Sequence, residues 1–165
     1  MASISGGALV TGAATRLGRS IALALASEGH DVAIHYASSQ AQALSCAEEA
    51  RALGVKAVTL QADLLDREAV AGLVPRALEA LGGPLGVLVN NASIFEHDTI
   101  RTATPENWDR HLESNLRAPF VLTQAMAAQG LEPLQDATGE PYSAGLIINM
   151  VDQRVRKLTP EFMTY

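Results

Sequence analysis

The sequence predicts a doubly wound α/β fold, in which a parallel sheet carries helices on both faces. Short apolar runs alternate with amphipathic stretches along all 165 residues, an order typical of strand-helix-strand units with right-handed crossovers. Hydrophobic residues make up 48% of the chain but aromatic residues only 4%, which favours helices packed on a sheet through small aliphatic side chains. A glycine-rich turn follows the first apolar run. We therefore expect a single Rossmann-type domain over residues 1–165.

The first half of the chain predicts three strands and three helices. The strand Ala8–Val10 leads into the turn 11–18, and apolar residues then recur at three and four positions from Leu17 to Ala26, where Gly29 ends the helix. The next predicted elements are a strand at 31–36, a helix from Ser38 or Ser39 to Leu53, a strand at 55–61 and a helix from Asp66 to Leu81. Pro75 predicts a kink in this last helix, since proline lacks the backbone N–H.

The second half continues the alternation. The almost wholly apolar run Leu85–Val89 is typical of a central parallel strand. Thr104 and Pro105 begin a helix, which Pro119 is expected to kink. One face of this helix carries the spaced apolar residues Trp108, Leu112, Leu116 and Phe120. The remaining predicted elements are a surface loop at 130–144, a strand at 146–151 and a helix from Pro160.

Composition excludes several classes of function. The net charge is −6 and the basic residues are scattered, so we expect no nucleic-acid or membrane partner. No apolar run approaches the length of a membrane span. The single cysteine, Cys46, and the lack of signal-peptide features at the start predict a cytoplasmic protein. The stretch Glu96-His97-Asp98 has no partner ligands at metal spacing, so we expect a solvated loop and no metal site.

Polar clusters follow the predicted strands, and ligands of doubly wound sheets bind beyond the carboxyl ends of the strands. In the turn 11–18, backbone N–H groups and a helix N-terminus favour a phosphate, and Gly12 and Gly18 permit a tight bend and a close approach. The common dinucleotide fingerprint G-x-G-x-x-G is absent. The site is therefore expected at residues 11–18, 35–39, 63–64, 90–95 and 150–154.

The residues after the second strand favour NADPH over NADH. A carboxylate that would bind the ribose 2′-hydroxyl is missing from the stretch 35–39. Arg16 instead offers a guanidinium that can pair with a 2′-phosphate, and Ser38 and Ser39 can add hydroxyl donors. The alternative is that Arg16 is solvated and the serines only cap a helix.

Taken together, these motifs resemble the short-chain dehydrogenase/reductase family over essentially the whole chain. The similarity rests on Thr11-Gly12-x-x-x-Arg16-x-Gly18, Asp63, Asn90-Asn91-Ala92-Ser93, Asn115 and Tyr165. The segments Ser93-Ile94-Phe95, Ser114-Asn115 with Ala118-Pro119, and Ile148-Asn149-Met150-Val151-Asp152 resemble its pteridine reductase branch. The family signature continues from the tyrosine as Tyr-x-x-x-Lys, and this chain stops at the tyrosine. We therefore expect these residues to be part of a longer enzyme and to be inactive alone.

The resemblance implies roles for individual residues. It implies that NADPH is bound by Gly12, Arg16, Leu17, Gly18, His35, Tyr36, Ser38, Ser39, Asp63, Leu64, Asn91, Ala92 and Ser93. Reduction of a pterin C=N bond needs a proton at nitrogen, and the family assigns this proton to Tyr165 working with Asp152. Asn115 matches an asparagine that holds a water in the proton path. The substrate would be bound by Ser93, Phe95, Asp152 and Tyr165, and the complete protein would be a homo-tetramer.

Other interpretations remain open from the sequence. The enzyme could reduce another carbonyl, on an acyl chain or a sugar, although Asp152 replaces the serine that usually polarises a carbonyl oxygen. The chain could also be a non-catalytic NADP(H)-binding module. Asn115 could merely bridge a helix break, and Phe95 could be a core residue under its loop. Finally, the basic residues 154, 156 and 157 could bind an anionic substrate tail or form a solvated loop.

Overall fold

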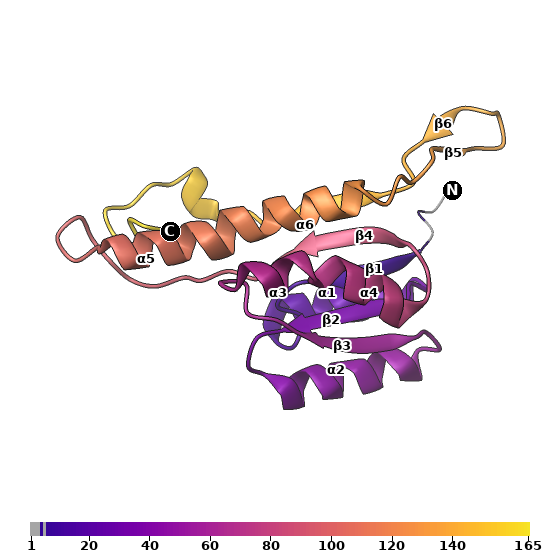
Figure 1. Cartoon of the computed structure of the whole chain (residues 1–165), viewed down its shortest axis with the longest axis horizontal. Coiled ribbons are helices and arrows are strands. Elements are labelled where there is room, and N and C mark those ends of the chain that lie inside the picture. The colour runs from indigo at the N-terminus through magenta and orange to yellow at the C-terminus, as the bar shows by residue number, and fades with distance from the viewer. Residues whose placement is uncertain (1–3, 5) are drawn as a thin grey trace.

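The computed structural model describes residue 4 and residues 6–165 and confirms the doubly wound α/β fold. Five strands form one parallel sheet in the order β3-β2-β1-β4-β7, and Figure 1 shows β4, β1, β2 and β3 one below another. Its strands are β1 (Gly7–Val10), β2 (Val32–Tyr36), β3 (Ala57–Gln61), β4 (Leu85–Asn90) and β7 (Leu146–Asn149). Because all five run in one direction, their carboxyl ends lie along one edge of the sheet.

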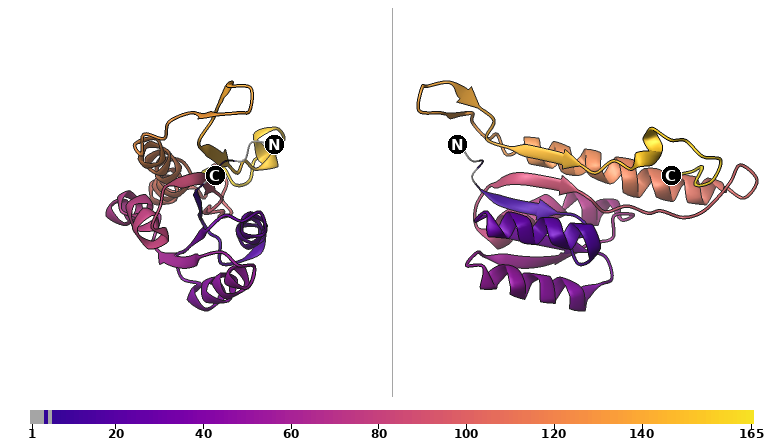
Figure 2. Two further views of the ribbon diagram at one scale, coloured as in Figure 1. Left: turned by 90° about the vertical axis from the view of Figure 1, so that its right-hand side faces the viewer. Right: turned by 180° about the vertical axis from the view of Figure 1, so that it is seen from behind.

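Helices cover both faces of the sheet, as the end-on view in Figure 2 shows. The helices α1 (Arg16–Ser27) and α2 (Gln40–Ala52) cover one face, and α3 (Arg67–Ala71), α4 (Leu73–Leu81) and α6 (Ala118–Ala127) cover the other. Alternate residues of a strand point to opposite faces. Ala8 and Val10 therefore pack in the core under α1 and α2, while Leu9 packs in the core on the other side. Both faces of β1 are buried, which explains its unbroken apolar sequence.

The predicted kink at Pro75 is a complete break. The helix α3 ends at Ala71, Gly72 separates the two segments, and α4 begins at Leu73. Pro75 cannot donate a hydrogen bond to a carbonyl in the preceding turn. It is accommodated because α4 begins anew and places the proline in its first turn, where the backbone N–H groups have no partner within the helix.

The long helix near Trp108 differs from the prediction in two respects. It runs from α5 (Pro105–Leu112) through the π turn η1 (Glu113–Arg117) into α6, and Pro119 lies in the first turn of α6 without interrupting it. Its buried side consists of His111, Ser114, Ala118, Leu122 and Met126. The predicted apolar face, which includes Trp108 and Phe120, is exposed. Trp108 and Leu112 are exposed because α5 extends past the end of the sheet (Figure 1) and covers no strand. Leu116 and Phe120 lie outside the buried side of η1 and α6.

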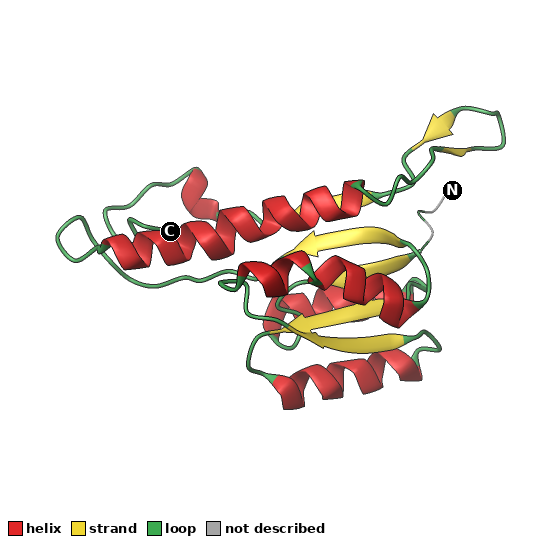
Figure 3. Cartoon of the chain, in the orientation of Figure 1, coloured by secondary structure: helices red, strands yellow, loops and turns green. Residues whose placement is uncertain are grey.

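The last third of the chain has less regular structure than predicted. The predicted loop 130–144 contains a small antiparallel hairpin of β5 (Leu134–Gln135) and β6 (Pro141–Tyr142). After β7 the chain forms only the single turn η2 (Gln153–Val155), and no helix begins at Pro160, as Figure 3 shows. Phe162 has φ 59°, a left-handed conformation that a right-handed helix cannot contain. Across the described residues, no helix combines the length and apolar character needed to cross a membrane.

A buried histidine ties two strand ends together. His35, in β2, is only 1% exposed. The N–H of Gly12 donates to its Nδ1 (3.0 Å), so Nε2 carries the ring hydrogen and donates to the carbonyl of Ala62 (3.1 Å). Burial lowers the pKa of His35 to about 4. The neutral ring therefore fixes the glycine turn after β1 against the segment after β3.

This histidine should make the stability of the protein depend on pH. The unfolded chain takes up a proton near pH 6.5 and the native chain near pH 4. As pH falls through this window the unfolded state binds more protons, so the free energy of unfolding should fall by about 3 kcal/mol. Urea unfolding of wild type and H35Q at pH 7, 5.5 and 4.5 measures the difference. H97Q, at an exposed histidine, is the control and should follow wild type; equal pH dependence of H35Q and wild type would contradict the assignment.

Candidate cofactor and active site

The strand order places the predicted polar clusters side by side. Along the carboxyl edge, the clusters at 63–64, 35–39, 11–18, 90–95 and 150–154 follow β3, β2, β1, β4 and β7 in that order. The connections from β1 lead one way along the sheet to β2 and β3, and the later strands lie on the other side. The reversal next to β1 is the position where open α/β sheets bind ligands.

The glycine turn is held by contacts within the protein. Gly12 has φ 63°, a conformation that favours glycine. A Cβ on Gly18 would collide with the carbonyl oxygen of Gly12 and would come within 2.5 Å of the Asn91 amide nitrogen. Gly18 is therefore needed for α1 to pack closely on the turn and on the loop after β4.

The loops after β1 and β4 are joined by Thr11, which the sequence placed in the glycine turn without assigning it a role of its own. Its buried hydroxyl donates to the carbonyl of Val89 (3.3 Å) and accepts from the N–H groups of Asn91 (2.9 Å) and Ala92 (3.0 Å). The Asn91 amide donates in return to the carbonyls of Thr11 (2.9 Å) and Gly12 (3.3 Å). The sequence signal for Thr11 is a hydroxyl placed directly at the end of an apolar strand.

The N-terminus of α1 is suited to an anion. Thr15 occupies the cap position but its side chain makes no capping hydrogen bond, so it does not satisfy the backbone N–H groups of the first turn. Arg16 and Leu17 are exposed beside it. Free N–H groups, the helix dipole and a guanidinium together fit a phosphate group. These residues therefore fit the phosphates of a dinucleotide.

The ends of β2 and β3 offer polar atoms and no carboxylate directly after β2. Ser38 is exposed, and Ser39 stands at the N-cap of α2 without a side-chain capping bond, so the capping alternative finds no support at Ser39. Asp63 is exposed and accepts from the N–H of Leu65 (3.0 Å). His35, Tyr36 and Leu64 are buried at this edge. We revise the predicted role of His35: both of its ring nitrogens bond to the protein, so it positions the turn.

The side chain of Asn115, in the π turn η1, is hydrogen-bonded to the loop after β4. Its Oδ1 accepts from the N–H of Ile94 (2.8 Å) and its Nδ2 donates to the carbonyl of the same residue (2.9 Å). The side chain therefore does not bridge a helix break. It fixes the backbone between Ser93 and Phe95, whose side chains are both exposed.

Aromatic rings gather beside this loop. Phe95 is 47% exposed, so it is not a core residue. The ring of Phe162 stacks on it with centroids 4.2 Å apart, and the ring of Tyr165 makes a T-shaped contact with it, with centroids 4.8 Å apart. The Arg154 guanidinium lies 4.3 Å from the centroid of Phe162, which places a cation over the stack. Phe162 was not among the predicted residues, because its place beside Phe95 depends on a loop that gives no periodic signal.

Tyr165 and Asp152 interact electrostatically at this edge. Burial raises the pKa of the Tyr165 phenol, the negative charge of Asp152 raises it further, and Arg154 lowers it. The phenol therefore keeps its proton at neutral pH. It is still 37% exposed, so a ligand can reach it. Asp152 is held by a hydrogen bond from the N–H of Arg154 (2.8 Å).

The stretch Glu96-His97-Asp98 is not the solvated loop that the sequence predicted. Asp98 is 2% exposed, and Thr164 donates to it from both its hydroxyl and its N–H. The side chains of 96 and 97 point elsewhere: Glu96 pairs with Arg110, and the ring of His97 packs on Phe162. Within the described residues, no group of three His, Cys, Asp or Glu side chains is placed to hold a metal ion.

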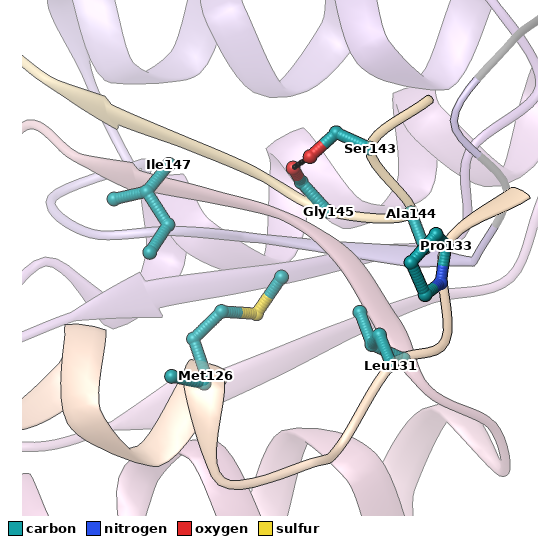
Figure 4. A pocket seen from close by; sticks show the side chains of 8 residues that line it. Met126, Leu131, Pro133, Ser143, Ala144, Gly145 and Ile147 are labelled. Atoms are coloured by element: carbon teal, nitrogen blue, oxygen red, sulfur yellow. Dashed lines mark hydrogen bonds between the residues drawn. The ribbon is translucent and has the colours of Figure 1, made fainter. Parts of the chain in front are cut away.

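A separate pocket lies near the other end of the sheet. Its volume is about 260 Å³, and it is lined by Met126, Ala127, Leu131, Pro133, Ser143, Ala144, Gly145 and Ile147. Figure 4 shows it between the end of α6 and the segment that enters β7. It has no charged side chain and lies at the amino end of β7. The carboxyl edge, and not this pocket, is therefore the candidate site.

Comparisons with known proteins show which family the chain belongs to. Residues 7–165 match the family model described as short chain dehydrogenase. The 3-oxoacyl-[acyl-carrier-protein] reductase FabG of Staphylococcus aureus is 39% identical over 143 residues, which are 87% of this chain and 54% of that protein. The chain thus spans about half the length of this curated relative.

Two solved structures are also similar. FolM alternative dihydrofolate reductase 1 from Brucella suis, in complex with NADP, is 39% identical with a TM-score of 0.83, covering 96% of this chain and 62% of that one. The Brucella canis protein of the same name, also complexed with NADP, is 38% identical with a TM-score of 0.85, covering 98% and 62%. With the family match extending from β1 to Tyr165, this chain belongs to the short-chain dehydrogenase/reductase family.

Proposed function

We propose that the protein is an NADPH-dependent reductase that delivers hydride to a C=N bond of a pterin-type substrate. The observation that carries the proposal is the partly exposed Tyr165 phenol in contact with the exposed ring of Phe95, at a place where burial and the negative charge of Asp152 both raise the pKa of the phenol. A flat heterocycle can stack on an aromatic ring, and its ring nitrogen needs a proton donor within reach.

The carboxyl edge is proposed to hold NADPH, which supplies the hydride when bound. The N-terminus of α1 with Gly12, Arg16, Leu17 and Gly18 would face its phosphates. Its other proposed contacts are Tyr36, Ser38, Ser39, Asp63, Leu64, Asn91, Ala92 and Ser93. The NADP in the two similar FolM structures supports this choice, as does the absence of a carboxylate directly after β2.

The protein groups proposed for the chemistry each have a defined task. Tyr165 gives its phenolic proton to the substrate nitrogen, and Asp152 hydrogen-bonds the ring and relays a proton from water back to the phenolate. Asn115 is proposed to orient a water on the proton path, while its bonds to Ile94 keep Ser93 and Phe95 at the substrate. A carboxyl group at position 152, in place of the serine that usually polarises a carbonyl oxygen, favours proton transfer to nitrogen.

A second candidate is reduction of a carbonyl on an acyl chain, which the similarity to FabG favours. The two functions are separated by NADPH consumption, measured as loss of absorbance, with protein expressed from its complete gene. Dihydrobiopterin and dihydrofolate test the first function, and an acetoacetyl thioester tests the second. Oxidation of NADPH with the thioester alone would reject the pterin proposal.

The complete protein is proposed to be a homo-tetramer. The exposed face of α5 and η1 carries Trp108, Leu112 and Leu116, and Phe120 continues it on α6. Contiguous apolar surface of this kind is common at contacts between proteins. Light scattering of the purified protein measures the number of subunits directly.

Arg16 should decide the preference between the two nicotinamide cofactors. Loss of a charge-assisted pair with the 2′-phosphate in R16A should weaken NADPH binding by about 10- to 100-fold and leave NADH binding nearly unchanged. R19A is the matched control on the same helix, because Arg19 pairs with Glu49 of α2. Fluorescence titration with both cofactors measures the effect. An equal loss for NADH and NADPH would contradict the assignment.

Removal of the phenolic hydroxyl should abolish most of the turnover. In Y165F the proton donor is lost, so kcat should fall by about 10²- to 10⁴-fold, while NADPH binding persists. Y142F, in the hairpin β5–β6, removes a hydroxyl far from the site and should keep full activity. D152A should lower kcat with the pterin substrate as well. A Y165F variant with wild-type kcat would exclude Tyr165 as the donor.

A further inference from the structure

A buried carboxylate holds the residue that precedes Tyr165. The hydroxyl of Thr164 donates to Oδ2 of Asp98, and the N–H of Thr164 donates to Oδ1 of the same carboxylate (3.2 Å). The backbone carbonyl of Asp98 also accepts from the N–H of Phe162 (2.7 Å). Three hydrogen bonds therefore join the loop after β4 to the three residues that end in Thr164.

A buried histidine of α5 completes this contact. His111 is 1% exposed, and its Nε2 accepts from the N–H of Glu96 (3.4 Å). The ring hydrogen is therefore on Nδ1, which lies 2.8 Å from the carbonyl of Asn107 and 3.0 Å from the hydroxyl of Thr164. Because that hydroxyl gives its hydrogen to Asp98, it accepts from His111 and shares the single Nδ1 hydrogen with the carbonyl of Asn107. Every polar atom in this chain of contacts has a partner.

The arrangement fixes the segment from two directions. His111 and Asn115 lie four residues apart, and both hold the loop after β4, at Glu96 and at Ile94. The same loop, through Asp98, holds Thr164. A charged carboxylate is costly to bury unless hydrogen bonds compensate it, and the Thr164 bonds lower the pKa of Asp98. The segment is thus locked in place next to Tyr165, whose ring lies 6.3 Å from that of His111.

We propose that Asp98, His111 and Thr164 are positioning residues, which hold the backbone before Tyr165 so that its ring stays in contact with Phe95 and its phenol faces the site. The inference rests on the proposed role of Tyr165 as proton donor. Asp98 and His111 touch no reacting atom in this arrangement. They act through Thr164. When the Thr164 side chain is held by hydrogen bonds, the backbone at this residue is fixed, and this limits the orientation of the Tyr165 side chain. Misplacement of a reacting group by about 1 Å can cost about a hundredfold in rate.

The test uses the nearly isosteric variant T164V in protein from the complete gene. Valine keeps the branched shape but removes the hydroxyl that both Asp98 and His111 contact. We expect kcat to fall by about 10- to 100-fold with KM for NADPH changed less than about twofold. T164S restores the hydroxyl and should recover most of kcat. A rate of T164V equal to that of wild type, or a loss that appears in KM alone, overturns the proposal.

The control removes a bond of the same kind elsewhere. T138V breaks the hydrogen bond from the Thr138 hydroxyl to Asp136 (2.6 Å) in the hairpin, and it should leave both kinetic constants unchanged. If T164V does not fold, D98N replaces it, because asparagine keeps one acceptor oxygen but cannot accept from both donors of Thr164 as a carboxylate does. Its kcat should fall in the same way, and a wild-type kcat overturns the proposal.

The experiments distinguish failure of the proposed pterin reductase function from failure of the positioning role. A wild-type protein that oxidises no NADPH with either dihydropteridine rejects the pterin reductase, and crystal structures of wild type and T164V then decide the positioning role alone. A Tyr165 phenol displaced by about 1 Å or more in T164V supports it. An unmoved phenol overturns it.

Discussion

The hydrogen bonds between Thr11 and the loop after β4 are the constraint on which the carboxyl edge depends. The turn after β1 and the loop after β4 come from segments about 80 residues apart in sequence. One buried hydroxyl bonds to both strand ends, and the Asn91 amide closes the contact from the other side. Because His35 holds the same turn from β2, three neighbouring strands end in one rigid frame. The N-terminus of α1, which lacks a side-chain capping bond, follows directly from this frame.

The loop after β4 connects this frame to the aromatic cluster. It begins at Asn91, is hydrogen-bonded at Ile94 by Asn115 and continues to Asp98, which binds Thr164. Hydrogen bonds along this one loop thus hold both the candidate phosphate site and the backbone that carries Tyr165. Polar networks with every partner satisfied specify a single arrangement. Such rigidity suits a reaction in which a donor and an acceptor must meet at a fixed distance.

Sequence patterns were sufficient to locate the elements of the fold where the structure is periodic. The strands that are buried on both faces were located within a few residues. A short apolar run bounded by turn residues is compatible with few structures other than a buried strand. The glycine turn and the polar clusters after β2 and β4 were also found in their observed places. Patterns failed at the face of α5, where apolar spacing was present but the sheet beneath it was not. They failed again after β7, where turns replace the expected helix.

The sequence by itself determined the fold class, the family and the edge of the sheet at which the candidate residues gather, because these follow from local periodicity and from motifs close together in the chain. Only the tertiary structure decided how single side chains are used. In the folded protein His35 is neutral and hydrogen-bonds two loops, and Asp98 is buried beside Thr164 and His111. Phe162 stacks on Phe95. These partners are far apart in sequence, and burial and hydrogen bonding between them arise only when the strands and loops have assembled.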